Sequence, residues 1–550
     1  MGHDEKTTSR EKPQGDAVDW LEDTAGADMT SKDAAADAAM KGQATTGYET
    51  LTLWETVKTF KVSTAVCFFA AFSAATDGYQ IGMNSGIVAN KGFIRQFATQ
   101  ATADGSRVLA SPVLAGWSSI QSVGQIVGMV SLSFVSSRFG RKVAMYTYWL
   151  ILASSIIAEC LARDWQVWLV AKLLAGIGVG CMQSTLPTYI SEVAPVRIRG
   201  GLLMLYSLWW TVGSFFAYIA MQTMNRQHPN EYLTPIYTQW AQIGLMLIIY
   251  VFLPESPAWC VTRGDMTRAR KELRKLHRGV KGYDVDQQLE VLILAAEHER
   301  AVAVEQKREH WYAIFRGVDG MRTVIALWTN LSQQFIGLTL FGTFGTYFFQ
   351  QAGLPDPFMI KCITSSINIA TVIVVVGLAD HVGRRWIACS ATSLMWLCCV
   401  IIGILGVITH TDATNYVLVL FACLWNMGMT ANGAAGWGFI GEISSQRLRP
   451  YTAGFGAACT CVIGVAMNQL TPYMVNQNQW NWGLRTGWFY AGVGLPFMVG
   501  MWLLIPETAR RSSAELDELF ERKIKPWRFH KTETATQRLV KQQKAERPEE

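Results

Sequence analysis

The sequence predicts an all-α membrane protein with twelve transmembrane helices, on the basis of its composition and its long apolar runs. Half of the 550 residues are hydrophobic and only 16% are charged, whereas a soluble domain carries about 25% charged residues. A wholly disordered chain would be rich in charge and poor in apolar residues, so that class is excluded. A spanning helix needs about 20 mostly apolar residues. Twelve such runs lie near residues 62–82, 113–135, 143–162, 166–190, 201–221, 239–253, 323–350, 359–379, 386–409, 415–440, 451–474 and 486–505.

Membrane topology explains the charge of the chain. Residues 1–50 hold eleven acidic and five basic side chains, so they sum to −6 and the rest of the chain sums to +12. Lys and Arg cluster in the connections that follow the even-numbered runs, and short basic connections stay in the cytoplasm. We therefore expect both termini to be cytoplasmic. The basic residues are not interleaved with exposed aromatics, as they would be in a nucleic-acid-binding protein. We therefore expect the lipid bilayer, and not a nucleic acid, as a partner of the chain.

The apolar runs divide the chain into five segments. A disordered cytoplasmic tail over residues 1–55 precedes a six-helix bundle over 56–253. A cytoplasmic linker over 254–321 follows, and its spaced apolar residues predict short amphipathic helices. A second six-helix bundle over 322–507 leads into a cytoplasmic tail over 508–550.

Three short motifs recur in the two bundles at nearly one offset. Phe139-Gly-Arg-Lys142 is echoed by Val382-Gly-Arg-Arg385, and Pro254-Glu-Ser256 is echoed by Pro506-Glu-Thr508. The third pair of motifs is centred on an acid, Glu192 or Glu442, that precedes an Arg-x-Arg sequence. Two repeated bundles that flank a central site are typical of transporters.

The repeated charges predict a gate network at the cytoplasmic face. The alternative is that each cluster only sets the membrane topology, and basic residues by themselves would fit that alternative. A glutamate at equivalent places in both bundles does not fit it. We expect Glu192 to pair with Arg141 and Arg199, and Glu442 to pair with Arg384 and Arg449. Arg138 belongs to the same network.

No pattern indicates an enzyme, a metal or another cofactor. The eleven cysteines contain no CxxC motif and lie mostly in apolar runs, so we read them as buried and unpaired. His381 and His410 lack partners at metal-ligand spacing. Gly176, Gly178 and Gly180 lie inside an apolar run with no flanking strand, so they serve close helix packing rather than nucleotide binding.

The loop motifs resemble those of the sugar porter family of the major facilitator superfamily. The resemblance covers roughly residues 55–510 and rests on the stretches Arg138-Phe-Gly-Arg-Lys142, Pro187-Thr-Tyr-Ile-Ser-Glu-Val-Ala-Pro195, Pro254-Glu-Ser-Pro257, Gln333-Gln334, Gly383-Arg-Arg385 and Pro506-Glu-Thr508. Three further stretches are similar to fungal maltose and general α-glucoside permeases: Tyr347-Phe-Phe-Gln-Gln-Ala-Gly353, Asn481-Trp-Gly483 and Glu515-Leu-Asp-Glu-Leu-Phe520. The resemblance implies the major facilitator fold and sugar uptake through the plasma membrane, in fungi often coupled to protons.

Polar side chains inside the apolar runs are the candidates for sugar binding. The amides of Gln333 and Gln334 can both donate to and accept from hydroxyl groups. Trp437 matches a central tryptophan of the family that can stack on a sugar face, although an interface belt or the core is the ordinary place for a membrane tryptophan. Further candidates are Gln80, Tyr79, Gln183 and Asn426.

Asp77 and Lys172 are the candidates for proton coupling. An ionisable residue inside a membrane is costly and therefore a functional candidate. The family carries an aspartate at the position of Gln80, and it faces a basic residue that is Lys172 here. Asp77 lies three residues earlier, on a similar helix face, so we expect it to pair with Lys172. A structural role for Asp77 near the outer rim is the alternative.

The sequence departs from the family at several polar positions. Gln80, Ser137, Lys172, Ser207 and Thr339 stand where the family usually has aspartate, aspartate, arginine, glutamine and asparagine. The altered polar groups leave open a transporter or exporter of a non-sugar metabolite on the same fold. A non-transporting sensor is a further alternative, but sensors tend to have longer cytoplasmic tails. The leading expectation is sugar transport, and the sequence makes no prediction of oligomeric state.

Overall fold

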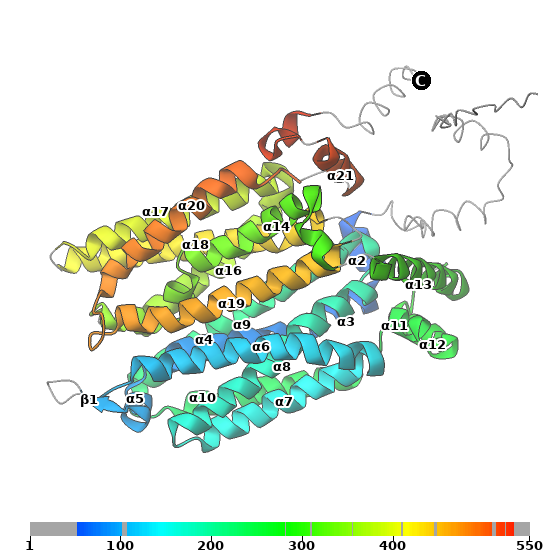
Figure 1. Cartoon of the computed structure of the whole chain (residues 1–550). Helices are drawn as coiled ribbons and strands as arrows, with labels where there is room; N and C mark the ends of the chain where they lie inside the picture. Colours follow the sequence, from blue (N-terminus) through cyan, green and yellow to red (C-terminus); the bar gives the residue numbers. More distant parts are fainter. Residues whose placement is uncertain are drawn as a thin grey trace, which may run out of the picture.

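Two bundles of long helices lie side by side and form most of the molecule (Figure 1). The computed structural model describes residues 52–101, 107–280, 282–308, 311–354, 356–408, 411–444, 448–508, 513–522 and 524–532. The bundles meet along two helix pairs, α6 with α19 and α9 with α16. We call the end of the bundles that carries α11–α13 the linker end, and the end that carries β1 the far end (Figure 1).

The first bundle contains the first six predicted spans. The first span is formed by α3 (Lys61–Ala71) and α4 (Ser73–Ile87), which are separated at Phe72. The other five are α6 (Ser111–Phe139), α7 (Arg141–Leu161), α8 (Trp165–Val193), α9 (Arg199–Gln227) and α10 (Leu233–Phe252). Short elements between them are α5 (Lys91–Phe97), the two-residue antiparallel strands β1 (Gln100–Ala101) and β2 (Arg107–Val108), and η1 (Val196–Ile198).

The second bundle repeats this plan with one broken helix. Its first span is divided into α14 (Gly317–Phe335), the π-helical segment η3 (Leu338–Thr343) and α15 (Gly345–Gln351). The following helices are α16 (Pro357–Val382), α17 (Arg384–Leu405), α18 (Asp412–Ile443), α19 (Arg449–Val475), η4 (Gly483–Arg485) and α20 (Thr486–Leu504).

Ten helices in the described ranges are long and apolar enough to cross a membrane, and eleven if a bent pair at the start of the first bundle is one span. The remaining predicted span, 323–350, is not a continuous helix. Gly337 has a φ of +98°, a left-handed conformation that interrupts the helix and that only glycine adopts readily. The predicted span 323–350 is therefore divided into three helical segments.

The linker and the tails form short helices at the linker end. The linker contains α11 (Pro257–Thr262), α12 (Met266–Leu276), α13 (Val285–Arg308) and η2 (Trp311–Phe315). The C-terminal segment contains α21 (Ser513–Glu521) and η5 (Pro526–Lys531). Helix α2 (Leu53–Thr59) begins within the predicted 1–55 tail, because Thr52 and Glu55 form a capping box at its start. The rest of that predicted tail lies outside the described residues.

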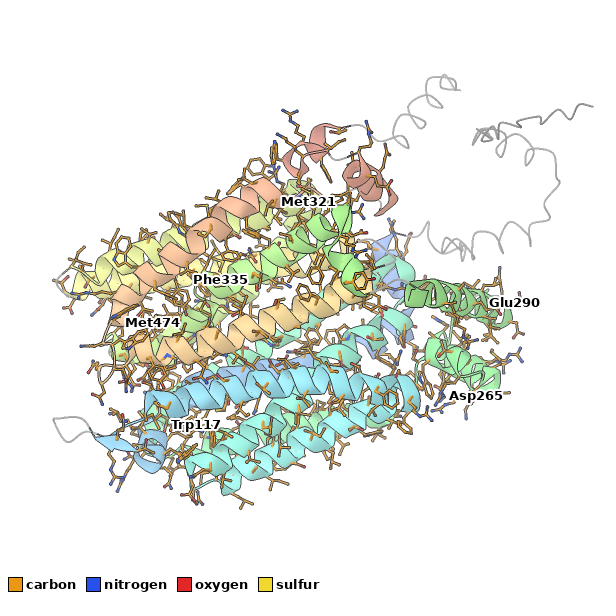
Figure 2. The ribbon with its side chains drawn as sticks, in the orientation of Figure 1. Trp117, Asp265, Glu290, Met321, Phe335 and Met474 are labelled. Carbon is orange, nitrogen blue, oxygen red and sulfur yellow. The ribbon has the colours of Figure 1, made fainter. Side chains whose placement is uncertain are left out.

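Figure 2 shows the two ends of the molecule through labelled side chains. Trp117 and Met474 lie toward the far end, whereas Asp265 and Glu290 lie on the linker helices at the opposite end. The linker docks on the first bundle through His277, whose ring meets Phe60 edge-on and lies 3.4 Å from the Ser63 hydroxyl. Burial in this contact lowers the pKa of His277 to about 4, so the imidazole is neutral at ordinary pH.

The repeated sequence motifs form the same structure in both bundles. Glu255 accepts a hydrogen bond from the backbone N–H of Arg141 at 3.0 Å, and Glu507 accepts one from the backbone N–H of Arg384 at 3.2 Å. Each carboxylate therefore sits at a helix N-terminus, where negative charge is favoured. Glycines with positive φ, Gly140 and Gly383, precede these helices and leave room for the carboxylates.

Small residues allow the closest helix contacts, as the glycine pattern predicts. A Cβ atom at Gly176 or Gly180 on α8 would lie 2.2 Å from the backbone oxygen of Gln121 or Gln125 on α6. The backbones of α6 and α8 therefore touch directly at these positions. Gly178 points to α7 instead, where a Cβ would lie 2.8 Å from Leu152.

Candidate functional site

The two bundles are joined by hydrogen bonds at the far end. Asn476 donates to the Ser111 hydroxyl at 2.9 Å, and Gln222 donates to Asp356 at 2.8 Å. Ser85 on α4 donates to the backbone oxygen of Gly342 at 3.2 Å, within the π-helical break of the other bundle. These contacts close the far end of the interface between the bundles.

Asp77 lies on α4 inside the first bundle and is fully buried. Its Oδ2 atom accepts hydrogen bonds from Gln183 on α8 at 2.9 Å and from the Tyr206 hydroxyl on α9 at 3.4 Å. Asp77 and Gln183, both predicted from the sequence, are thus brought together. Tyr206 completes the cluster and was not predicted, because a tyrosine in an apolar run carries no distinctive signal.

The predicted pairing of Asp77 with Lys172 is wrong. Lys172 forms a buried ion pair with Glu159 on α7, with 2.8 Å between Nζ and Oε1. The two side chains are 3% and 0% exposed. Three residues along a helix correspond to a rotation of about 300° and a rise of about 4.5 Å, so Asp77 and Gln80 point to different neighbours.

Amides from helices α4 and α10 contact this ion pair. Gln80 on α4 donates to Glu159 Oε1 at 2.7 Å, and Gln239 on α10 donates to Oε2 at 3.0 Å. Lys172 also donates to Asn84 on α4, whose amide reaches Gln121 on α6 at 2.8 Å. Glu159 was not predicted as a site residue. The signal that could have found it is an acidic residue inside the predicted span 143–162, but its place near the end of that run made it look like a residue of the helix end.

Tyr79 and Gln80 point into the first bundle rather than toward the second. The Tyr79 hydroxyl is hydrogen-bonded to Thr238 on α10, and Gln80 contacts Glu159. Their contacts therefore place them beside the ion pair. Their predicted place in a sugar-binding shell is not supported by these contacts.

In the second bundle, Gln333 is held in a buried amide chain. It donates to Asn432 on α18 at 2.7 Å, and Asn432 donates to Thr392 on α17 at 2.6 Å. Gln334 is half-buried and lies near Gly464 on α19. Asn426 donates to the backbone of its own helix at Ala422. The side chain of Trp437 lies outside the described residues.

One half of the predicted gate network is visible. Arg141 on α7 donates to both carboxylate oxygens of Glu192 on α8, at 2.7 and 3.1 Å, and also to the Ser136 carbonyl. The pair joins two helices of one bundle at the linker end. Arg138 and Arg199 are exposed, and the contact expected between Arg199 and Glu192 is not among the described hydrogen bonds and ion pairs.

The second half of the network follows the first only in part. Arg384 opens α17 against Glu507, as Arg141 opens α7 against Glu255. The side chains of Glu442 and Arg449 lie outside the described residues, so the pairing of Glu442 with Arg384 and Arg449 stays a prediction.

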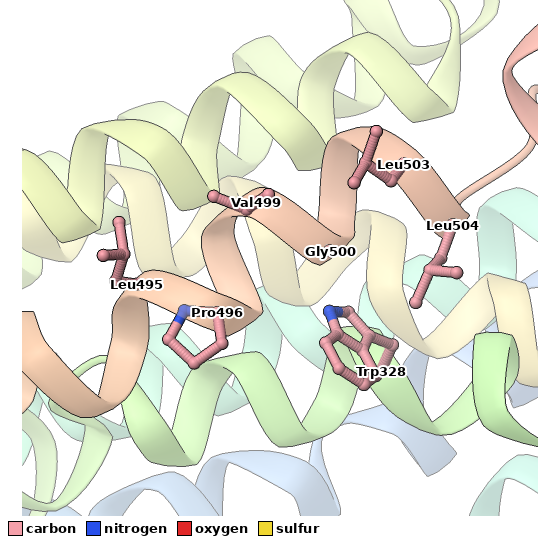
Figure 3. Close-up of a pocket in the computed structure, with 7 residues that line it drawn as sticks. All are labelled: Trp328, Leu495, Pro496, Val499, Gly500, Leu503 and Leu504. Carbon is pink, nitrogen blue, oxygen red and sulfur yellow. The ribbon is translucent and has the colours of Figure 1, made fainter.

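The surface hollow beside α20 is unsuited to a polar substrate. Figure 3 shows its lining, which consists of Trp328 from α14 and residues of α20 around Pro496 and Gly500. The lining side chains are apolar, and Leu495, Val499 and Leu503 are exposed on the outside of the bundle. These exposed apolar side chains suit contact with lipid rather than with a polar substrate. No group of three or more potential metal ligands occurs within the part of the chain that the structure describes.

Comparison with known proteins places the chain in a family. The family described as "Sugar (and other) transporter" matches residues 66–520. A General alpha-glucoside permease of Saccharomyces cerevisiae is 29% identical over 467 residues, which cover 83% of this chain and 75% of that protein. The MFS transporter fmqE of Aspergillus fumigatus is 28% identical, covering 87% of this chain and 91% of that protein.

A solved structure shares the fold. The inward open conformation of the xylose transporter XylE from E. coli superimposes with a TM-score of 0.67 at 20% identity, covering 83% of this chain and 99% of that one. Three observations support the same family: the two similar bundles, the repeated helix caps, and the family match over residues 66–520. The chain is a multi-pass membrane transporter, not an enzyme, and belongs to the "Sugar (and other) transporter" family of the major facilitator superfamily.

Proposed function

We propose that the protein carries a hexose or an α-glucoside such as maltose across the plasma membrane together with a proton. The supporting observation is that each bundle holds a buried cluster of groups that can bind hydroxyls. Asp77, Gln183 and Tyr206 form the cluster of the first bundle, and Gln333 and Asn432 form that of the second. Buried amides and carboxylates are the groups that recognise sugar hydroxyls.

Alternating access is the proposed transport cycle, in which the bundles rock about a central site. With both termini in the cytoplasm, the far end is extracellular. The hydrogen bonds of Ser85, Gln222 and Asn476 then close the extracellular side in this conformation. Opening to the outside requires these contacts to break.

An uptake experiment tests the proposed substrate class. The chain is expressed in yeast that lack hexose and maltose transporters, and uptake of radiolabelled glucose and maltose is measured with and without a proton uncoupler. We expect uptake of one of the sugars, and we expect the uncoupler to abolish accumulation. Uptake that survives uncoupling would leave sugar transport and remove the symport. Absence of uptake by correctly inserted protein would favour a non-sugar substrate or a sensor.

Replacing Glu192 with glutamine is expected to slow sugar transport about tenfold. Hydrogen bonds to charged groups are worth about 1.5–3 kcal/mol, and about 1.4 kcal/mol corresponds to a tenfold change in an equilibrium. In the proposed gate this pair is stronger in one of the two conformations, so loss of the two-pronged contact with Arg141 shifts the balance between them. The initial rate of uptake is compared at equal amounts of inserted protein.

The control for this variant is Glu290→Gln, which removes an exposed carboxylate from α13. This control should transport at the wild-type rate. If Glu192→Gln also transports at that rate, the ion pair with Arg141 serves topology or local packing and is not a gate.

A further inference from the structure

The ion pair between Glu159 and Lys172 is deeply buried. Both side chains lie inside the first bundle, at most 3% exposed. Taking two charges out of water is costly, and apolar residues of similar volume often give equal or better stability. Ionisable side chains in a membrane mark ion and proton pathways. The pair is therefore a candidate for a function that needs charge.

Glu159 lies close to the far end of the bundle. It is two residues before the end of α7 at Leu161, and Lys172 is seven residues after the start of α8 at Trp165. In the proposed orientation the far end faces the outside, so a proton from the extracellular side has a short distance to travel. This position suits a carboxylate that is loaded from the outside.

The charged and titratable surroundings of Glu159 are few. From α8 it faces Lys172, and from α4 and α10 it meets the neutral amides of Gln80 and Gln239. Other titratable or charged groups in this part of the bundle are Cys160, its neighbour in the chain, Tyr79, which is bonded to Thr238, and Arg163, which donates to Tyr232. In the described contacts, Lys172 is the charged partner of Glu159.

Helix α4 connects the ion pair to the far-end closure. Gln80 and Asn84 hold one face of α4 to Glu159 and Lys172. The next residue, Ser85, donates to Gly342 in the π-helical break of the second bundle. Just beyond the end of α4, the Ala89 carbonyl accepts a hydrogen bond from Gln350 on α15 at 3.2 Å. A change at the ion pair thus alters the anchor of the helix that closes the far end.

We propose that Glu159, paired with Lys172, is the proton-binding carboxylate of this transporter. The inference rests on the proposed sugar transport. An extracellular proton adds to the Glu159 carboxylate, the pair changes from net zero to +1, and Gln80 and Gln239 lose hydrogen bonds to a charged acceptor. The anchor of α4 therefore depends on whether the proton is bound. The proton leaves on the cytoplasmic side, and the ion pair forms again.

The test uses purified full-length protein in liposomes and radiolabelled glucose or maltose. Exchange of internal for external sugar at equal pH is compared with accumulation driven by an inward proton gradient. Exchange needs only the loaded carrier, whereas accumulation needs a group that gains and loses a proton. The variants are Glu159→Gln, the neutral pair Glu159→Gln with Lys172→Met, Asp77→Asn as the rival carboxylate, and Glu231→Gln as a control on the exposed far-end loop.

We expect exchange by the neutral pair within about threefold of the wild type and no accumulation above the external concentration. Glu231→Gln should accumulate sugar as the wild type does. Accumulation by Glu159→Gln or by the neutral pair would overturn the proposal. So would loss of exchange as well as accumulation by a neutral pair that elutes as folded protein, since the role would then be structural. Loss of accumulation with exchange retained in Asp77→Asn alone would transfer the role to Asp77.

The wild-type protein separates the two proposals. Exchange without proton-driven accumulation would overturn proton binding at Glu159 and leave sugar transport standing. Absence of both exchange and accumulation for both sugars would overturn the proposed function itself.

Discussion

Replacing Lys172 with methionine is expected to destabilise the folded protein by about 3–5 kcal/mol, the usual cost of removing one partner of a buried ion pair. The Glu159 carboxylate would remain fully buried, with only the amides of Gln80 and Gln239 as donors. The measurement is the thermal unfolding midpoint of purified protein in detergent. It is monitored as the fraction of protein that still elutes as a single species after heating.

Two further variants show whether this effect comes from the buried charge. Adding Glu159→Gln to Lys172→Met removes both charges and should recover most of the lost stability. Lys275→Met breaks the pair with Glu272, which has the same 2.8 Å distance but a lysine that is 52% exposed. Exposed pairs contribute at most about 1 kcal/mol, so this control should hardly shift the midpoint. A small shift for Lys172→Met would contradict the prediction, because it would show that an unpaired Glu159 costs the fold little.

Replacing Gly176 with leucine is expected to prevent correct packing of the first bundle. Even a Cβ atom at this position would lie 2.2 Å from the Gln121 carbonyl and 3.0 Å from the Cα of Gly124. The obstacle is backbone, which cannot rotate away as a side chain can, so the cost should exceed the 1–3 kcal/mol typical of overpacked cores. We expect a loss of folded protein, measured as the monodisperse peak of a fluorescent fusion in size-exclusion chromatography.

The matched control for Gly176 is Gly244→Leu on α10. A Cβ atom there meets nothing within 4 Å, and Gly244 is exposed on the outside of the bundle. This variant should give the wild-type peak. A wild-type peak for Gly176→Leu as well would mean that α6 and α8 can separate without loss of the fold.

Much of the fold could be predicted because membrane helices are visible in local sequence. Runs such as 166–190 must be helical, since a backbone in lipid has to satisfy its own hydrogen bonds. The break at Gly337 was missed because its flanking residues are as apolar as those of a continuous helix. A left-handed glycine there depends on packing against neighbouring helices, which hydropathy does not describe.

The candidate site could be predicted in its residues more than in its contacts. Asp77, Lys172 and Gln333 were found because polar groups are scarce in apolar runs. Their contacts were not found, because local sequence does not tell which side chains face one another between packed helices. Glu159 is 13 residues from Lys172 in the chain and faces it only because α7 and α8 pack antiparallel.

The sequence by itself determined the membrane class, the repeated bundles, the glycine contacts and the family, since these depend on local composition and on motifs at fixed spacing. Only the tertiary structure decided that Lys172 pairs with Glu159 while Asp77 joins Gln183 and Tyr206. The physical reason is that a rotation of about 60° around α4 separates the two directions. Which partner a side chain meets within such an angle depends on how the helices pack and not on which residues they carry.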